Sequence, residues 1–114
     1  MERNGMVENI KKVLEKNGIP AVRLVWKLKQ KPNTFYTFQR INRQPVVEAD
    51  DEVKEETEIW YVRLITKTDF ENLLDETVKN LREAGYTVSS IDQELYEEAT
   101  GYWIIPITIK NLKE

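Results

Sequence analysis

Hydrophobic positions near the start of the chain recur every three to four residues over about residues 5–17, and this spacing predicts an amphipathic helix. Asn17-Gly18 and Pro20 follow this stretch. They would end the helix, because glycine readily takes a left-handed conformation and proline cannot continue the helical turn. The apolar stripe could bind a partner, but we expect it to pack on the protein's own sheet.

Alternating hydrophobic and polar positions predict three strands in the first half of the chain, at residues 21–28, 34–39 and 56–66. Residues 30–33 form the expected turn between the first two strands. Both faces of residues 56–66 are largely apolar, which predicts a central strand. Residues 41–54 show no clear period, so we expect them to form a long, mobile loop within a β-hairpin.

A second helix is predicted to begin shortly after residue 66. Thr68 and Glu71 have the spacing of a capping box, apolar positions from Phe70 to Ala84 mark one helix face, and Gly85 would end the helix. Residues 86–97 and 102–109 then predict two further strands. Pro106 lacks an amide donor, which favours an edge position or a bulge for the last strand.

The order of these elements indicates one α+β domain over residues 1–114. Short connections between successive strands favour antiparallel pairs. We therefore expect a mainly antiparallel sheet of four to five strands, with the two helices packed on one face and the long loop in its hairpin.

Composition narrows the range of functions. The chain has no Cys and no His. It therefore lacks a thiol nucleophile, the commonest general base and the commonest ligands of transition metals. We expect no enzymatic activity, no cofactor and no metal. No run of about 18 apolar residues is present, which predicts no membrane partner, and no apolar signal core is visible near the N-terminus, which predicts a cytoplasmic product.

Charge is segregated along the chain. Seven Lys or Arg and no acid lie between Lys16 and Val47, whereas seven Asp or Glu and one Lys lie between Glu48 and Glu58. Two patches of opposite sign on one small domain suit a head-to-tail contact between copies, which builds rings or filaments. The alternative is that the two stretches neutralise each other within one monomer.

Two further chemistries are possible for these stretches. The acidic stretch offers oxygen ligands to a divalent cation at Asp50, Asp51, Glu52 and Glu55, but it lacks the ligand spacing of an EF-hand loop. The basic stretch over residues 23–43 interleaves cations with aromatic residues, as single-stranded nucleic-acid binders do. A pI near 5.2 and the neighbouring acids make nucleic acid an unlikely partner.

Several short segments and their order resemble a family of phage and prophage tail proteins. The matching segments are Pro32–Phe38, Ala49–Asp51, the strand Glu58–Asp69 with the helix Phe70–Ala84, and the hairpin Glu94–Tyr102. They resemble the tail terminator, or tail-to-head joining, proteins of long-tailed phages. The resemblance implies a non-catalytic subunit of a homo-hexameric ring that caps the tail tube, ends its polymerisation and meets the head connector or stopper protein.

The same resemblance implies location in the host cytoplasm and, after assembly, in the virion tail. Another neck component, such as a stopper or adaptor, remains an alternative. From the order of charges we expect inter-subunit contacts at Arg40, Arg43, Glu48, Asp50, Asp51 and Glu52. Each exposed pair would contribute at most about 1 kcal/mol, so the chain could be monomeric in dilute solution.

Overall fold

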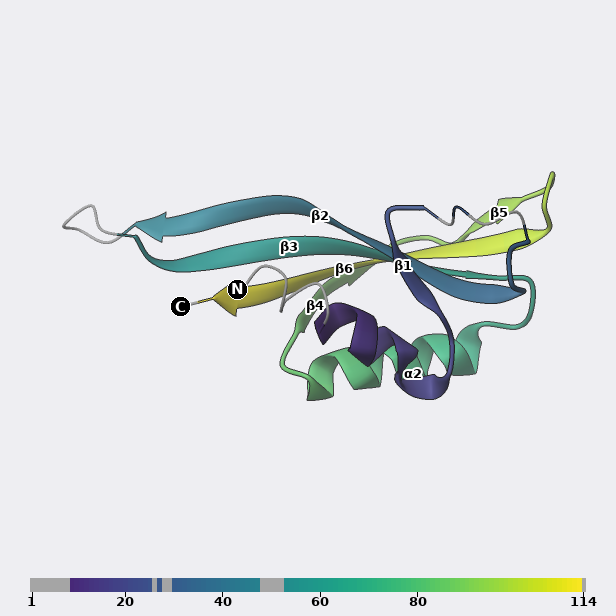
Figure 1. Ribbon diagram of the computed structural model, residues 1–114, viewed down its shortest axis with the longest axis horizontal. Coiled ribbons are helices and arrows are strands. Elements are labelled where there is room, and N and C mark those ends of the chain that lie inside the picture. The colour runs from purple at the N-terminus through teal and green to yellow at the C-terminus, as the bar shows by residue number, and fades with distance from the viewer. Residues whose placement is uncertain (1–8, 26, 28–29, 48–52, 114) are drawn as a thin grey trace.

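The computed structural model describes residues 9–25, 27, 30–47 and 53–113. It shows an α+β fold in which two helices lie on one face of a mixed, mostly antiparallel sheet (Figure 1). The expected fold class is thus confirmed, with six strands in place of four or five. In the described part of the chain, no helix is long and apolar enough to span a membrane.

The first helix covers residues 9–14 and continues as the 3-10 turn η1 (Glu15–Asn17). The expected start of this helix near residue 5 lies outside the described residues. The remaining elements follow in chain order: β1 (Ala21–Arg23), β2 (Thr34–Val47), β3 (Val53–Thr66), α2 (Glu71–Glu83), β4 (Thr87–Ile91), β5 (Leu95–Glu97) and β6 (Tyr102–Lys113). The sheet order is β1-β2-β3-β6-β4, and β5 also pairs with β6.

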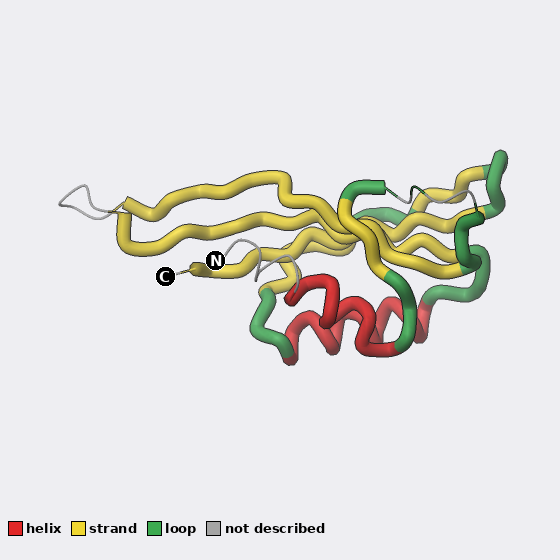
Figure 2. The backbone as a smooth tube through the Cα atoms, viewed as in Figure 1, coloured by secondary structure: helices red, strands yellow, loops and turns green. Residues whose placement is uncertain are grey.

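The prediction of a long loop over residues 41–54 is wrong. Residues 41–47 continue β2 and residues 53–54 begin β3, so a long hairpin replaces the loop (Figure 2). Its register shifts between Arg40 and Asn42 and again between Val46 and Val47. Such bulges insert an extra residue into a strand and interrupt the two-residue period, which explains why the sequence shows no alternation here. Residues 48–52, between the strands, lie outside the described part.

The strand expected over residues 21–28 is shorter than predicted and pairs differently. β1 ends at Arg23, and it runs parallel to β2, with Ala21 opposite Tyr36. Leu24 then has a φ of 74°, which turns the chain out of the sheet. Because the two strands are parallel, no tight hairpin joins them. Trp26 and Leu28, expected within this strand, lie outside the described residues.

The capping box predicted for the second helix does not form. α2 begins at Glu71, after Phe70, and no side chain caps it from the position of Phe70. The carboxylate of Asp69 accepts a hydrogen bond from the backbone N–H of Glu71 at 3.2 Å. Thr68 instead donates its backbone N–H to the hydroxyl of Thr66 at 3.1 Å. The helix therefore starts two or three residues later than the spacing indicated.

Pro106 lies on a central strand, not on an edge, and the register shift between β4 and β6 falls at Val88 and Ser90. β6 is flanked by β3 on one side and by β4 and β5 on the other. The carbonyl of Pro106 accepts a hydrogen bond from the N–H of Asp92 at 2.9 Å. In an antiparallel ladder the N and O of one residue face the same neighbour, so the missing donor of Pro106 faces the segment at Asp92. There the single strand expected over residues 86–97 is split into β4 and β5.

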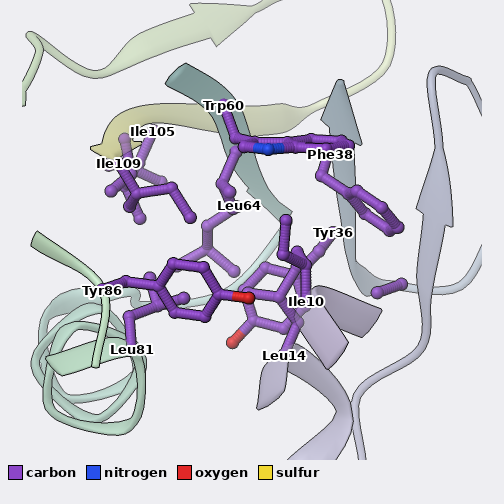
Figure 3. Close-up of a cluster of buried hydrophobic side chains, with 13 residues drawn as sticks. Ile10, Leu14, Tyr36, Phe38, Trp60, Leu64, Leu81, Tyr86, Ile105 and Ile109 are labelled. Carbon is purple, nitrogen blue, oxygen red and sulfur yellow. The ribbon is translucent and has the colours of Figure 1, made fainter. Parts of the chain in front are cut away.

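The core lies between the helices and one face of the sheet, which we call the helix side. Ile10 and Leu14 of the first helix and Leu81 of α2 meet Trp60 and Leu64 of β3, and all are at most 2% exposed (Figure 3). Burial of such side chains stabilises a fold by about 1.5–3 kcal/mol each. The described part of the apolar stripe of the first helix therefore packs on the protein's own sheet.

Polar groups at the edge of this core are paired. The hydroxyls of Tyr36 and Thr77 are hydrogen-bonded, and burial raises the pKa of Tyr36 above its ordinary value. Glu15 joins the first helix to β1 by accepting from Lys11 and from the N–H of Ala21. Burial disfavours the charge of Glu15, but these hydrogen bonds and the Lys11 charge outweigh burial and lower its pKa. The sheet and the first helix are thus fixed together.

Candidate assembly surface

The structure describes only part of the predicted contact set. Arg40 lies on β2, and Arg43 stands opposite Glu58 in the β2–β3 register. Glu48, Asp50, Asp51 and Glu52 fall on residues 48–52, outside the described part of the chain. The possible cation ligands Asp50, Asp51 and Glu52 lie there too. Among the described residues, no group of three or more Asp or Glu has a geometry that could hold a metal ion.

Arg40 pairs with an acid of its own chain. Its guanidinium lies 3.9 Å from the carboxylate of Glu58, and its side chain is 33% exposed whereas that of Glu58 is 1% exposed. The indole N–H of Trp60 also donates to Glu58, at 3.1 Å. A buried carboxylate is costly unless it is paired and hydrogen-bonded, and these two neighbours provide both. Glu58, which the sequence placed in the acidic stretch, is therefore part of the core.

A bulge places Arg40 and Arg43 in equivalent positions. Arg40 stands opposite Trp60 and Arg43 opposite Glu58, two residues apart on β3, although the two arginines are three residues apart on β2. Ile41 is the extra residue and is 50% exposed. The bulge thus shortens the three-residue separation on β2 to a two-residue separation on β3.

The face opposite the helices, which we call the outer side, is only partly covered. Residues Ile59, Tyr61, Arg63 and Ile65 alternate with the buried positions of β3 and are half-buried. Arg63 lies over the ring of Tyr61, 4.7 Å from its centre. No helix of the described residues covers this face (Figure 2). The sequence predicted that both faces of β3 would be apolar, and the outer one is left accessible.

A pocket of about 220 Å³ lies on the outer side, and we call it the outer pocket. The chain after β1 forms one wall, and β2, β3 and β6 form the floor. Lys31, Arg63 and Glu97 are its charged lining residues. Glu97 accepts a hydrogen bond from the hydroxyl of Thr100 in the β5–β6 turn. The apolar lining residues are Leu24, Val25, Phe35, Ile65, Tyr102 and Ile104.

Two interactions hold the wall of the outer pocket in place. The hydroxyl of Tyr102 donates to the carbonyl of Pro32 at 2.7 Å, which ties β6 to the end of the segment before β2. At the other end, the N–H of Leu24 donates to Phe38 on β2 and the N–H of Val25 donates to Arg23. Lys67 lies 5.0 Å from the centre of the Tyr102 ring and adds a cation next to the pocket. The sequence contains no motif that predicts this pocket.

The described aromatic residues of the basic stretch are not available to nucleic acid. Phe35, Tyr36 and Phe38 are at most 3% exposed. Phe38 packs against Trp60 with ring centres 6.1 Å apart, and the Arg23 guanidinium lies over Trp60 at 5.5 Å. Base stacking needs exposed ring faces. The stacking role considered for these three side chains is therefore wrong, and their alternation reflects burial in the sheet.

Comparison with protein-family models finds no match for this chain. A comparison with curated proteins also finds none.

Proposed function

We propose that this chain is a structural, non-enzymatic subunit that completes a phage or prophage tail. It would associate with copies of itself as a ring at the head-proximal end of the tail tube, between the tube protein and the head connector or stopper. The observation that carries the proposal is the asymmetry of the sheet, which has a closed helix side and an accessible outer side with a pocket. A ring subunit needs two different surfaces, one for each neighbour.

The long hairpin supports the same role. β2 and β3 extend well beyond the part of the sheet covered by the helices, and the molecule measures 52 × 26 × 25 Å (Figure 1). β1 pairs only with residues 36–38 of β2, so no described strand flanks the outer edge of β2 from Arg40 to Val47. A long strand edge favours pairing or packing with another chain. The hairpin is thus suited to reach a neighbouring subunit or the tube.

The resemblance to tail terminator proteins agrees with this geometry. The segments that carry it include the start of β2, the central strand β3 with α2, and the β5–β6 hairpin. The strands among these elements form part of the sheet and line the outer pocket. Another neck component would share the need for two neighbour surfaces, so the position along the tail has to be tested directly.

The decisive experiment adds the purified chain to tail tubes of the phage whose genome carries it. Electron microscopy with a gold-labelled antibody should show the chain as a ring at one end of each tube, and tubes still growing should stop elongating. Binding along the tube wall, or no binding, would contradict the proposal. Binding only to isolated head connectors would favour the stopper or adaptor alternative.

A further inference from the structure

We propose that the outer pocket receives an acidic side chain from residues 48–52 of a second copy. Each copy would give its acidic segment to one neighbour and its outer pocket to the other. This inference depends on the proposed self-association, and it names the contact through which that association occurs.

The chemistry of the outer pocket suits a carboxylate. Lys31 and Arg63 contribute two cations to its lining, against one acid, Glu97, which already accepts from Thr100. Walls of apolar side chains exclude water, and a charge pair is stronger where water is excluded. Residues 48–52 read Glu-Ala-Asp-Asp-Glu and offer four carboxylates. The segment and the pocket are thus complementary in charge.

A buried hydroxyl in the pocket lining lacks a partner. Thr37 is 4% exposed, lines the outer pocket, and its hydroxyl oxygen has no hydrogen-bond partner in the structure. Such a group costs free energy until it is satisfied. In the register, Thr37 stands opposite Arg63, the pocket cation on β3. A carboxylate in the pocket could accept from this hydroxyl while it meets the nearby positive charge.

The geometry of one chain prevents its own acidic segment from reaching the outer pocket. About ten residues of β2 separate Thr37 from Val47, which is about 33 Å of strand at 3.3 Å per residue. The paired hairpin holds this distance, because β2 pairs with β3 from Thr34 to Val47. Val47 and Val53, which flank segment 48–52 in the chain, are therefore too far from the outer pocket for five residues, which span at most about 18 Å, to bridge the distance. A second copy has to supply the carboxylate.

The wall of the outer pocket is formed at the cost of backbone strain. Leu24 has a φ of 74°, and the Val25 N–H donates to the Arg23 carbonyl at 3.0 Å, so Leu24 is the central residue of a γ-turn. This form of the turn is rare and strained for a residue other than glycine. The turn leaves Leu24 and Val25 52% and 58% exposed beside the pocket. Strain that displays apolar side chains is consistent with a contact that covers them.

Because the chain contains no cysteine, disulfide trapping can test the contact without background. One variant carries Ala49→Cys in the acidic segment, and the other carries Val25→Cys at the pocket wall. Oxidation of the two variants together should give a covalent heterodimer, and the double variant should give a ladder up to the size of a ring. High salt should reduce both yields, since the acidic segment and the cations attract each other through solvent before the contact forms.

The matched control carries Lys79→Cys, an exposed position on α2 on the other side of the sheet. Mixed with Ala49→Cys, it should give at least fivefold less heterodimer than Val25→Cys does. Adding Arg63→Glu to the Val25→Cys variant should lower its yield several-fold, whereas adding Lys79→Glu should leave it unchanged.

Equal yields from Val25→Cys and Lys79→Cys would overturn the pocket contact. That result would leave the tail-completion proposal intact if rings still form at tube ends, because another surface would then build them. Conversely, specific crosslinks in a chain that does not bind tail tubes would support the pocket contact and contradict the proposed place in the tail.

Discussion

The two sides of the sheet are built from the same strands, but one side forms the core and the other is left accessible. On the helix side, Trp60, Val62 and Leu64 of β3 are at most 1% exposed and belong to the core. On the outer side, Arg63 and Ile65 of the same strand are half-buried and line a pocket. The helix side accounts for the stability of the fold. The outer side is left for contacts that the isolated chain does not make.

Because only one side of the sheet belongs to the core, mutations can separate effects on folding from effects on association. Substitutions on the helix side should lower the free energy of unfolding, and substitutions on the outer side should change binding with little effect on folding. Three predictions test this division, and each compares two positions or two variants within the chain.

The largest effect is expected for Leu81→Ala on the helix side. Leu81 is 0% exposed, and its truncation leaves a cavity between α2 and the sheet, so the free energy of unfolding should fall by about 3 kcal/mol. Leu24→Ala makes the same chemical change at a residue that is 52% exposed, and it should cost less than about 1 kcal/mol. Urea unfolding followed by tryptophan fluorescence measures both. Equal losses would contradict the division between the two sides.

A smaller effect is expected at the buried ion pair. Arg40→Ala should lower the free energy of unfolding by about 2 kcal/mol, because it removes the cation beside the buried carboxylate of Glu58. This is less than for a fully buried pair, since Arg40 is 33% exposed and 3.9 Å away. Adding Glu58→Gln removes the charge that Arg40 balances and keeps an acceptor for Trp60. The double variant should therefore lose less stability than Arg40→Ala alone.

The smallest effect, of opposite sign, is expected for Leu24→Gly on the outer side. Glycine takes a positive φ without strain, so relief of about 2 kcal/mol should exceed the entropy that glycine adds to the unfolded chain, about 1 kcal/mol. Stability should rise by about 1 kcal/mol in thermal unfolding. The yield of the Ala49–Val25 crosslink should fall, because the glycine frees the pocket wall. A loss of stability would show that the Leu24 side chain contributes to the fold.

Regular periods in the sequence predicted most of the fold. The stripe of the first helix, the two apolar faces of β3 and the apolar face of α2 all follow from spacing, because a buried face repeats with the period of its element. The α+β class and the position of both helices on one face are confirmed.

The spacing of hydrophobic residues gave wrong predictions where the backbone departs from a regular helix or strand. The bulge at Ile41 hides a strand that continues to Val47, and the turn at Leu24 ends β1 early. Neither feature has a sequence signal, because both residues are apolar and have no glycine or proline beside them. The parallel pairing of β1 with β2 was missed for the same reason.

The candidate site was predicted even less completely. The sequence grouped Glu58 with the solvated acids, because charge order along the chain does not show which carboxylate faces the core. Its burial depends on Arg40 and Trp60, which the β2–β3 register brings beside it. The outer pocket was not predicted at all, since its lining comes from segments that are distant in sequence and become neighbours only in the folded sheet.

The central place of β6 also constrains how the molecule can fold. The β2–β3 hairpin joins neighbouring segments and can form within microseconds, as local hairpins do. β6 follows every other strand in the chain, yet it has to enter between β3 and β4, where it pairs Thr66 with Trp103 and Val62 with Ile107. Closing such long loops is slow, and until it happens β3 presents an apolar, unpaired edge. The time before β6 docks is therefore when this protein is most prone to aggregate, and folding yield should depend on how fast that last strand finds its place.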